Sequence, residues 1–478
     1  VSHFAYSDNI LLSDPIFAGN SLSYTFLADF LSAVLVKMGA NLVSALIVPG
    51  FLFSLLFVAA FYYFVFRLTG RQNVALLSLL LFLLGGGLGA VFFLQDIPGL
   101  NFEAIINFLK TSNKEYTNLS NSNIYWTSFL NSLFLPQRAL NMGIVIGVLI
   151  LTCLVLALQK KESKYFLFAG ITAGFLPTLH LHTLLAVAIV GFFLILLLAD
   201  FPKIASFKYL AYFSLPLAVL GIFQLLFLFP EGGQYLKIQL GWMAKNENWL
   251  LFWIKNLGFF FLLIPAALLT LNKTLKKIYL AFFTLFFISN IIVFQPYDYD
   301  NLKIFIYWFM LNAVIFSILL TALWGKNIFA KIAAVLLGII LVFSSLIDAI
   351  SLYLRPGYQL FTKQEIVLAE TIRSNTGSAD IFLTADQHNN PILALSGRTI
   401  VMGYRGWLWS HGIDYKEREK DVSLMFQGAP DTKDLLRKYN VNYVVIGPAE
   451  KNTFWANEAF YSQNYPLFID ENGIKIYK

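Results

Sequence analysis

Long apolar segments recur through most of this chain, and they constrain its fold more than any other feature. Runs of about 17 to 25 residues, each long enough to cross the roughly 30 Å hydrocarbon layer of a membrane as a helix, follow one another from residue 43 to residue 353. The chain is 58% hydrophobic and only 13% charged, whereas soluble domains average about 25% charged residues. The sequence therefore predicts a polytopic, all-α membrane domain.

The apolar runs predict about ten membrane spans within a transmembrane domain over 43–356. Residues 1–42 precede them as an outer loop. In that loop, residues 24–41 are expected to form a helix in the membrane interface, with Asp29 and Ser32 as its polar positions and Gly39 at its end. The spans are expected at 43–66, 73–95, 140–158, 165–180, 183–199, 208–229, 250–271, 278–294, 303–324 and 328–353.

Basic residues predict how the spans are oriented. Alternate connections are short, and together they carry 12 Lys and Arg against only Glu162 and Asp200. By the positive-inside rule these connections are cytoplasmic, so the longer connections over 96–139, 230–249 and 295–302 face outward. The net charge of +7 is therefore a topology signal, and no nucleic-acid partner is expected. The basic residues are Arg67, Arg71, Lys160, Lys161, Lys164, Lys203, Lys208, Lys273, Lys276, Lys277, Lys326 and Lys331.

The composition changes near Gly357, and residues 357–478 are predicted to form a small extracytoplasmic α/β domain. This region holds 13 Lys and Arg and 14 Asp and Glu, and β-type stretches alternate with helical ones. The capping box "TKQE" begins a helix that ends near Asn375. Strands are expected at "DIFLT", "RTIVMG" and "NYVVIG", with helices over 414–427 and 431–439, whereas "GYRGWLWSHG" has neither period.

Residues 165–199 form one apolar stretch between two lysine-rich connections. Because both flanks are expected inside and one span takes about 20 residues, the chain must turn back within the membrane. Pro177 breaks the run just before "LHLHT". Non-helical backbone at that depth is tolerated only where it is buried in protein or lines a water-filled cavity. His180 and His182 are therefore expected to mark such a cavity. They can be donors to a phosphate, metal ligands, or a polar turn bonded to the backbone.

The stretch "QPYDYDNLKI" places Asp298, Asp300 and Lys303 in a short connection between two spans. Ionisable residues at membrane depth are expensive and by default suggest a functional site. The two aspartates share a face of an extended loop, and Asp300 and Lys303 share a helix face at i,i+3. A solvated loop with an Asp300–Lys303 ion pair is the alternative. We favour a functional cluster because the loop is short and both its flanks are spans.

Further positions suggest contacts with a ligand. In "FLPQRALNMG", Arg138 stands just before a span, where a phosphate is a suitable partner and Gln137 adds a neutral donor. A snorkelling arginine is the alternative. Trp242 in the outer loop can stack on a sugar or belong to the interfacial aromatic belt. Arg405 can face a ligand, although we favour a segment that docks the domain on the membrane.

Several functional motifs are absent from the sequence. It contains no Walker loop, dinucleotide fingerprint, zinc-ligand spacing or nucleophile elbow. Its single cysteine, Cys153, lies in an apolar run, so no disulfide holds the C-terminal domain. The glycine run over 85–89 is expected inside a span, where it allows close helix packing. No cofactor is assigned with certainty, and a divalent metal stays open.

The order of several motifs resembles a known family. The motifs "SDPIFAGNSLSYTFLADFLSA", "LPQRALNMG", "LPTLHLHT", "GW", "YDYDNLKIF" and "ADQHNNPILALSGRTIVMGYRGWLWSHG" together resemble prokaryotic integral-membrane glycosyltransferases of the GT-C superfamily. The relatives are similar to protein mannosyltransferases and to the enzyme that adds aminoarabinose to lipid A. The resemblance covers nearly the whole chain, and it is carried by the order of the motifs.

The resemblance implies a membrane transferase that moves a sugar from a polyprenyl-phosphate donor to an acceptor at the outer membrane face. In that family an acid in the first outer loop is the base. The chain opens with Val1 rather than Met, and the matching aspartate is expected upstream of it, so Asp8 and Asp14 are the fallback candidates. The resemblance also implies that a membrane-level cavity is lined by Arg138, His180, His182, Asp298, Asp300 and Lys303.

Two other classes of protein stay open. A transporter or flippase of lipid-linked glycans would spread charged groups through both halves of the membrane and show an internal repeat, whereas the polar positions gather on the outer side. A non-catalytic membrane assembly protein would lack an acid in the completed first loop. The acceptor and the donor sugar are not defined by the sequence.

Overall fold

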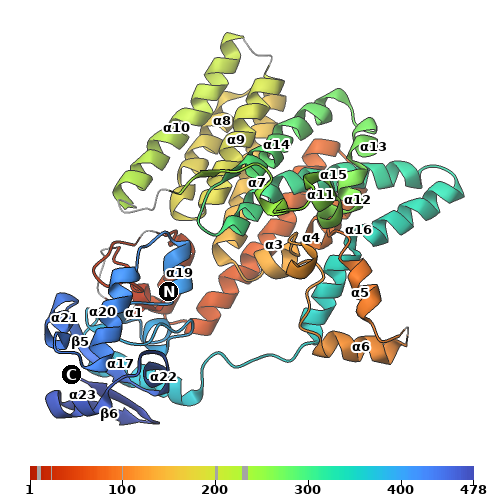
Figure 1. The fold of residues 1–478 in the computed structure, drawn as a ribbon. Helices are drawn as coiled ribbons and strands as arrows, with labels where there is room; N and C mark the ends of the chain where they lie inside the picture. The colour runs from red at the N-terminus through yellow and green to blue at the C-terminus, as the bar shows by residue number, and fades with distance from the viewer. Residues whose placement is uncertain (8–11, 23, 100, 200–202, 229–234) are drawn as a thin grey trace.

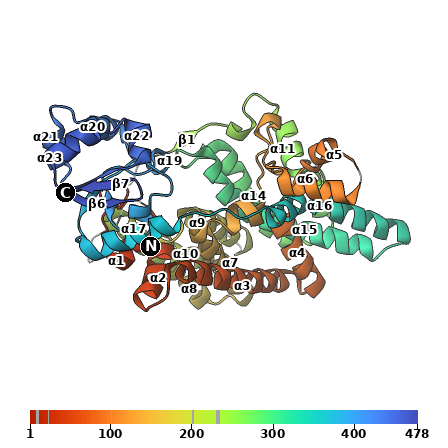
Figure 2. The ribbon, with the colours of Figure 1, turned by 90° about the horizontal axis from the view of Figure 1, so that it is seen from below.

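The computed structural model of the chain describes residues 1–478 apart from 8–11, 23, 100, 200–202 and 229–234. The described chain is mostly helical, with a small sheet in its C-terminal part. Figure 1 shows long helices above and to the right, and the C-terminal domain at the lower left beside the N-terminus. In Figure 2, seen from below, the N-terminus again lies beside this domain.

Seven helices in the described part of the chain are long and apolar enough to cross a membrane. The chain is therefore a multi-pass membrane protein, as predicted. At the centre is α15, in which residues 302–320 are all buried, as expected for a helix that is hydrophobic on every side. The seven are α3 (Leu42–Thr69), α7 (Arg138–Lys160), α9 (Leu181–Leu198), α10 (Ile204–Leu228), α14 (Lys273–Ile291), α15 (Leu302–Trp324) and α16 (Ile328–Leu354).

Three of the predicted spans fall on shorter or interrupted helices. The continuous helix expected over 73–95 is wrong, because the chain leaves the helix at the glycine run. The three segments contain α4 (Gln72–Leu84) with α5 (Ala90–Asp96); α8 (Ser163–Gly174) with η3 (Leu176–Thr178); and α11 (Trp249–Leu257) with α12 (Phe259–Leu262) and α13 (Ile264–Leu269).

The break between α4 and α5 is held by α16. Ser344 donates its hydroxyl to Gly87 O at 2.7 Å and accepts the N–H of Ala90 at 2.8 Å. The non-helical backbone thus has partners inside the protein, as membrane depth requires. The close packing expected at the glycines is confirmed, because a Cβ added to Gly89 would lie only 1.6 Å from Tyr116 O.

The connection between α5 and α7 is fixed by two buried polar side chains. Asp348 of α16 accepts the backbone N–H groups of Tyr116 at 2.7 Å and Thr117 at 2.9 Å. Asn256 of α11 accepts the N–H of Trp126 at 2.9 Å. This connection therefore packs into the helices rather than standing free. It contains α6 (Phe102–Thr111), η1 (Ser120–Ser122) and η2 (Phe129–Phe134), the last a π-helix.

The turn predicted within 165–199 is present between α8 and α9. Gln224 of α10 donates its amide to Gly174 O at 2.5 Å, and the N–H of Phe26 donates to Thr178 O at 3.0 Å. The turn is buried in protein, which satisfies its backbone without water.

The C-terminal domain contains a five-stranded sheet in the order β4-β3-β5-β7-β6. Strands β3, β4 and β5 are parallel, and β7 runs antiparallel to β5 and β6. The three predicted strands are confirmed as β3, β4 and the central β5. The strands are β3 (Ile381–Leu383), β4 (Thr399–Ile400), β5 (Val441–Ile446), β6 (Leu467–Glu471) and β7 (Ile474–Tyr477).

The three helices predicted for this domain are confirmed as α17, α20 and α21, whereas α22 and α23 were not predicted. The capping box of Thr362 and Glu365 begins α17, and Asn390 caps α18. The segment "GYRGWLWSHG", expected to be irregular, contains the short helix α19. The helices are α17 (Lys363–Asn375), α18 (Pro391–Ala394), α19 (Arg405–Ser410), α20 (Lys416–Gln427), α21 (Thr432–Lys438), α22 (Pro448–Phe454) and α23 (Glu458–Asn464).

The N-terminal segment, which includes α1 (Ser2–Tyr6), packs on the C-terminal domain. Pro15 O accepts the N–H of Ile400 at 3.0 Å, and the N–H of Ala18 donates to Ile400 O at 3.2 Å. Phe17 belongs to the hydrophobic core of the domain. The chain then returns to the helices through α2 (Leu27–Lys37), whose eleven residues span about 16 Å, too short to cross a membrane.

The basic connections lie away from the C-terminal domain, along the upper and right-hand edges of the molecule in Figure 1. Some are joined directly: Arg67 donates to Gln159 Oε1 at 3.4 Å, and Lys277 donates to Leu197 O at 2.8 Å. These contacts place the end of α3 beside the end of α7, and the end of α9 beside the start of α14. That the basic connections are cytoplasmic stays a prediction.

We predict that Gly89→Ala destabilises the protein, because its new methyl group would collide with the backbone of Tyr116. Overpacking of this kind costs about 2 kcal/mol or more. Thermal unfolding in detergent measures the effect. Gly50→Ala is the matched control, since nothing lies within 4 Å of a Cβ at that position in α3. Equal melting temperatures for the two variants would contradict the packing described here.

Candidate functional site

Charged and polar side chains meet where the helices approach the C-terminal domain. They come from α2 and the segment before it, from α7, from the start of α9, and from α15 and the connection before it. We call this set the polar cluster: Tyr24, Asp29, Arg138, His180, His182, Gln295, Asp300 and Lys303.

Arg138, the first residue of α7, joins that helix to α2. It donates from Nη1 to Asp29 Oδ1 at 2.6 Å, from Nη2 to Ala28 O at 2.9 Å, and to the hydroxyl of Ser32. A partly buried guanidinium needs an anionic partner, and Asp29 supplies it. Gln137 donates from Nε2 to Ser132 O at 3.4 Å. Arg138, the side chain predicted to bind a phosphate, is therefore held by the carboxylate of Asp29.

The two predicted histidines lie side by side at the start of α9, with ring centroids 5.1 Å apart. His180 is buried, and its Nδ1 lies 2.8 Å from the hydroxyl of Thr183, which lies 2.5 Å from that of Tyr307. His182 contacts the side-chain amide of Gln295 through its Nε2. His180 thus acts as a helix cap, whereas His182 points to the connection that precedes α15.

The connection before α15 forms the short helix η5 (Asp298–Asn301). Lys303 is buried, and its Nζ lies 2.7 Å from Asp300 Oδ1, the i,i+3 ion pair that the sequence allowed. Asp298 is half-buried, and its side chain makes no hydrogen bond or ion pair with the residues that the structure describes. Asn301 holds the connection in place, because its amide donates to Ile292 O at 2.6 Å.

Tyr24 links the two ion pairs. Partial burial raises the pKa of its phenol to about 12, and the negative charges of Asp300 and Asp29 add to this effect. Both carboxylates therefore lie close enough to Tyr24 to act on it. His182 in turn contacts Gln295, which belongs to the same connection as Asp300. The polar cluster thus brings together segments that are far apart in the sequence.

The C-terminal domain contributes to the edge of this site through α19. The ring of His411 stacks on Tyr24, with centroids 4.1 Å apart and planes at 14°. Burial lowers the pKa of His411 to about 4, so its ring is neutral at pH 7. Arg405, for which the sequence left a contact with a ligand open, pairs with Asp386 at 2.5 Å and with Glu419. These two acids hold the start of α19.

A polar groove lies beside the site. It has a volume of about 450 Å³ and is lined by η1 and by residues around Tyr125, Lys245 and Lys255. Tyr125 packs against Tyr299, with ring centroids 4.7 Å apart. Trp242, predicted to contact a sugar, is buried behind Tyr299 and donates its Nε1–H to a backbone carbonyl. Tyr125 and Tyr299 therefore form the aromatic surface nearest the groove.

Two short strands connect the groove to the polar cluster. Residues Lys237–Ile238 form β1, which pairs antiparallel with β2 (Ile292–Val293). The connections at 235–249 and 294–301 are therefore held together by backbone hydrogen bonds. Lys245, at φ 53°, adopts the left-handed conformation and donates from Nζ to the hydroxyl of Tyr125 at 2.6 Å.

The fallback acids of the N-terminal segment are not in the polar cluster as far as the structure describes them. Asp8 lies outside the described residues. Asp14 is buried against the C-terminal domain, where its Oδ1 accepts the N–H of Ile16 at 3.0 Å. Burial raises the pKa of Asp14 to about 6, although the N–H of Ile16 and the charge of Arg418 oppose this.

The arrangement of the histidines and acids does not fit a metal site. Among the residues that the structure describes, no three His, Cys, Asp or Glu side chains converge on a point. His180 is bonded to Thr183 and His182 to Gln295, so the imidazoles have other partners. No chemical step through a metal is derived for this site.

Several residues of the site were missed from the sequence. The sequence treated Asp29 only as a polar position of an interfacial helix, and its ion pair with Arg138 was not predicted. Tyr24, Gln295 and His411 offered no such signal, because their positions depend on how separate segments meet.

Comparison of the chain with known protein families and with curated proteins found no match in either set.

We predict that Asp14→Asn changes how stability depends on pH. The pKa of Asp14 is raised from its ordinary value of 3.8 to about 6 in the folded state. The contribution of protonated Asp14 to the free energy of unfolding is therefore fully present below pH 3.8, and it is lost as the pH rises through about 6. At pH 7 the charged carboxylate costs about 3 kcal/mol. The Asp14→Asn variant should therefore be more stable than the wild type at pH 7. Its stability should also change less with pH between pH 4 and 7.

Thermal unfolding at a series of pH values measures this difference. Asp431→Asn, an exposed position of the same domain, is the control and should follow the wild type. Parallel curves for Asp14→Asn and the wild type would show that Asp14 is not buried as described.

Proposed function

We propose that this chain is a membrane glycosyltransferase that moves a sugar from a polyprenyl-phosphate-linked donor to an acceptor at the outer membrane face. The observation that carries the proposal is the polar cluster, in which the pairs Arg138–Asp29 and Lys303–Asp300 lie around Tyr24. Two cations and two carboxylates at one end of apolar helices suit a ligand that is both anionic and lipid-linked.

The proposal includes the finer architecture. About ten spans, of the kind found in GT-C glycosyltransferases, place the polar cluster and the C-terminal domain on the extracytoplasmic side. The positions of the basic connections support this orientation, because they lie away from the C-terminal domain. The shorter helices α4, α8 and α11 to α13 pack among the seven long ones, and as three further spans they would bring the total to about ten.

Arg138 and Lys303 would bind the phosphate of the donor. Each is now paired with a carboxylate, and an arriving phosphate competes with Asp29 and Asp300 for these cations. Arginine binds phosphate through two parallel hydrogen bonds, and lysine binds it as a point charge. His182 adds a neutral donor beside them. As the bond between the anomeric carbon and the phosphate oxygen breaks, the two cations stabilise the charge that develops on the leaving phosphate.

A carboxylate would act as the general base. The hydroxyl oxygen of the acceptor bonds to the anomeric carbon, and its proton passes to Asp29 or Asp300 once the phosphate holds their former partners. Asp14 is unsuited to this role, because it is buried in the C-terminal domain.

The acceptor would lie along the outer groove. Tyr125 and Tyr299 offer an aromatic surface, and Lys245 and Lys255 offer donors. Aromatic rings next to polar groups suit a sugar or another polar acceptor, since one face is apolar and the edge is polar.

We predict that membranes containing the protein transfer radiolabelled sugar from polyprenyl-phosphate sugars, and that Asp300→Asn reduces the rate by about a hundredfold or more. Arg138→Ala should raise KM for the donor, because it removes a phosphate ligand. The control is Lys164→Gln, whose ion pair with Glu162 lies at the opposite end of the helices.

Comparison of Asp29→Asn with Asp300→Asn assigns the base, since the base variant lowers kcat without raising KM. Wild-type transfer that is matched by Arg138→Ala and Asp300→Ala would show that the polar cluster is not the site. Movement of lipid-linked glycans across the membrane without transfer would instead favour a flippase, and neither activity would favour an assembly protein.

A further inference from the structure

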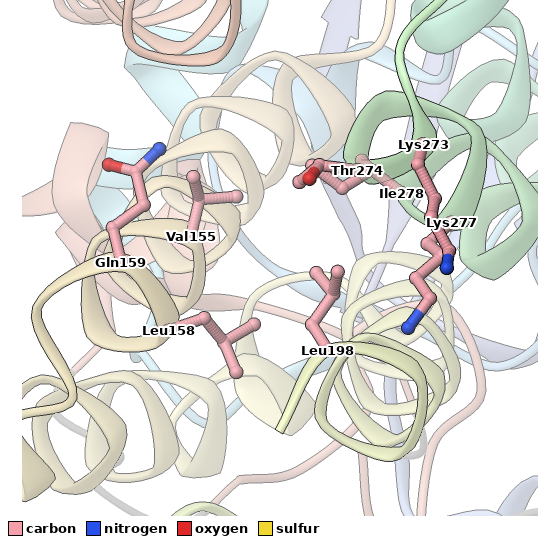
Figure 3. A pocket seen from close by; sticks show the side chains of 8 residues that line it. All are labelled: Val155, Leu158, Gln159, Leu198, Lys273, Thr274, Lys277 and Ile278. Carbon is pink, nitrogen blue, oxygen red and sulfur yellow. The ribbon is translucent and has the colours of Figure 1, made fainter. Parts of the chain in front are cut away.

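A second cavity lies at the basic end of the helices, far from the polar cluster. Its volume is about 310 Å³, and it lies between α7, α9 and α14. Figure 3 shows Lys273 and Lys277 on one wall, with Val155, Leu158 and Gln159 across the cavity. The proposed transfer reaction makes no use of this cavity.

The lining of the cavity separates into an apolar part and a cationic part. Four of its side chains are aliphatic, and Lys273, Lys277, Thr274 and Gln159 supply polar atoms. None of the lining residues is acidic. Such a cavity favours a ligand that has hydrocarbon and an anionic group side by side. The aliphatic residues are Val155, Leu158, Leu198 and Ile278.

The surroundings add positive charge. Arg67 donates to Gln159, which lines the cavity, and Nε of Arg67 is buried without a partner among the described residues. The cavity also lies at the beginning of α14, where the partial positive charge of a helix N-terminus favours anions. Lys277 donates to the last turn of α9, to Leu197 O, so an anion bound there would bridge α9 and α14.

We propose that this cavity binds the phosphate of an anionic phospholipid from the leaflet on the basic side of the membrane. Lys273 and Lys277 hold the phosphate, Thr274 donates a hydrogen bond, and the acyl chains lie on the aliphatic wall. Basic pockets between membrane helices recognise lipid headgroups in this way. The cavity is at the level where headgroups lie, because the helices begin and end there, and a soluble phosphate would leave its aliphatic wall without a partner.

Binding of phosphatidylglycerol, compared with phosphatidylcholine, tests the proposal in nanodiscs that contain the whole chain. The wild type should bind phosphatidylglycerol preferentially and unfold at a higher temperature in its presence. Lys273→Gln should weaken binding about fivefold, and the double variant with Lys277→Gln about thirtyfold. Lys276→Gln, on the same helix but outside the cavity lining, should bind as the wild type does.

The unfolding temperature of each variant in phosphatidylcholine alone separates loss of lipid binding from loss of folding. Lys273→Gln is the decisive variant, because Lys273 is exposed and its replacement should leave the fold intact. Equal affinity for the two lipids, or an equal effect of Lys276→Gln, would overturn the proposal. Inorganic phosphate or glycerol 3-phosphate that reproduces the stabilisation without lipid would overturn the choice of a phospholipid. None of these results depends on whether the chain transfers sugars.

Discussion

Backbone that leaves a helix among the apolar segments of this chain must find hydrogen-bond partners inside the protein, because lipid offers none. This constraint explains the residues that interrupt the helices. Ser344 holds the glycine break after α4, Gln224 holds the turn after α8, and Asp348 holds the connection that begins near Tyr116. These bonds permit non-helical backbone among membrane helices. The same requirement pairs Arg138 with Asp29, so the charges of the candidate site also fix its walls.

The polar cluster is assembled from side chains of several separate segments. Arg138 joins α2 to α7, Lys303 lies at the start of the most deeply buried helix, and His182 contacts the connection that Asn301 holds in place. The C-terminal domain closes one side of the cluster through the stacking of His411 on Tyr24. This domain is therefore part of the site's boundary, and the packing of the N-terminal segment on it keeps the two parts together.

The sequence predicted what depends on local pattern. Hydrophobic run lengths, the Pro177 turn, the capping box at Thr362 and the central strand near Val444 were recovered because each follows from neighbouring residues. The break at glycines 85–89 was missed, since an apolar run reads as one helix unless the partner that stabilises its interruption is known. Partners distant in sequence were missed too: the backbone carbonyl that accepts the Nε1–H of buried Trp242 and the two acids that pair with Arg405 were not predicted.

The claim that the polar cluster and the basic connections lie on opposite sides of the membrane is tested most directly by cysteine labelling. In a Cys153→Ser background, Lys420→Cys in the C-terminal domain should react in intact cells with a thiol reagent that does not cross membranes. Lys276→Cys and Lys161→Cys should react only after the cells are permeabilised. Labelling of all three positions from the same side would contradict the account.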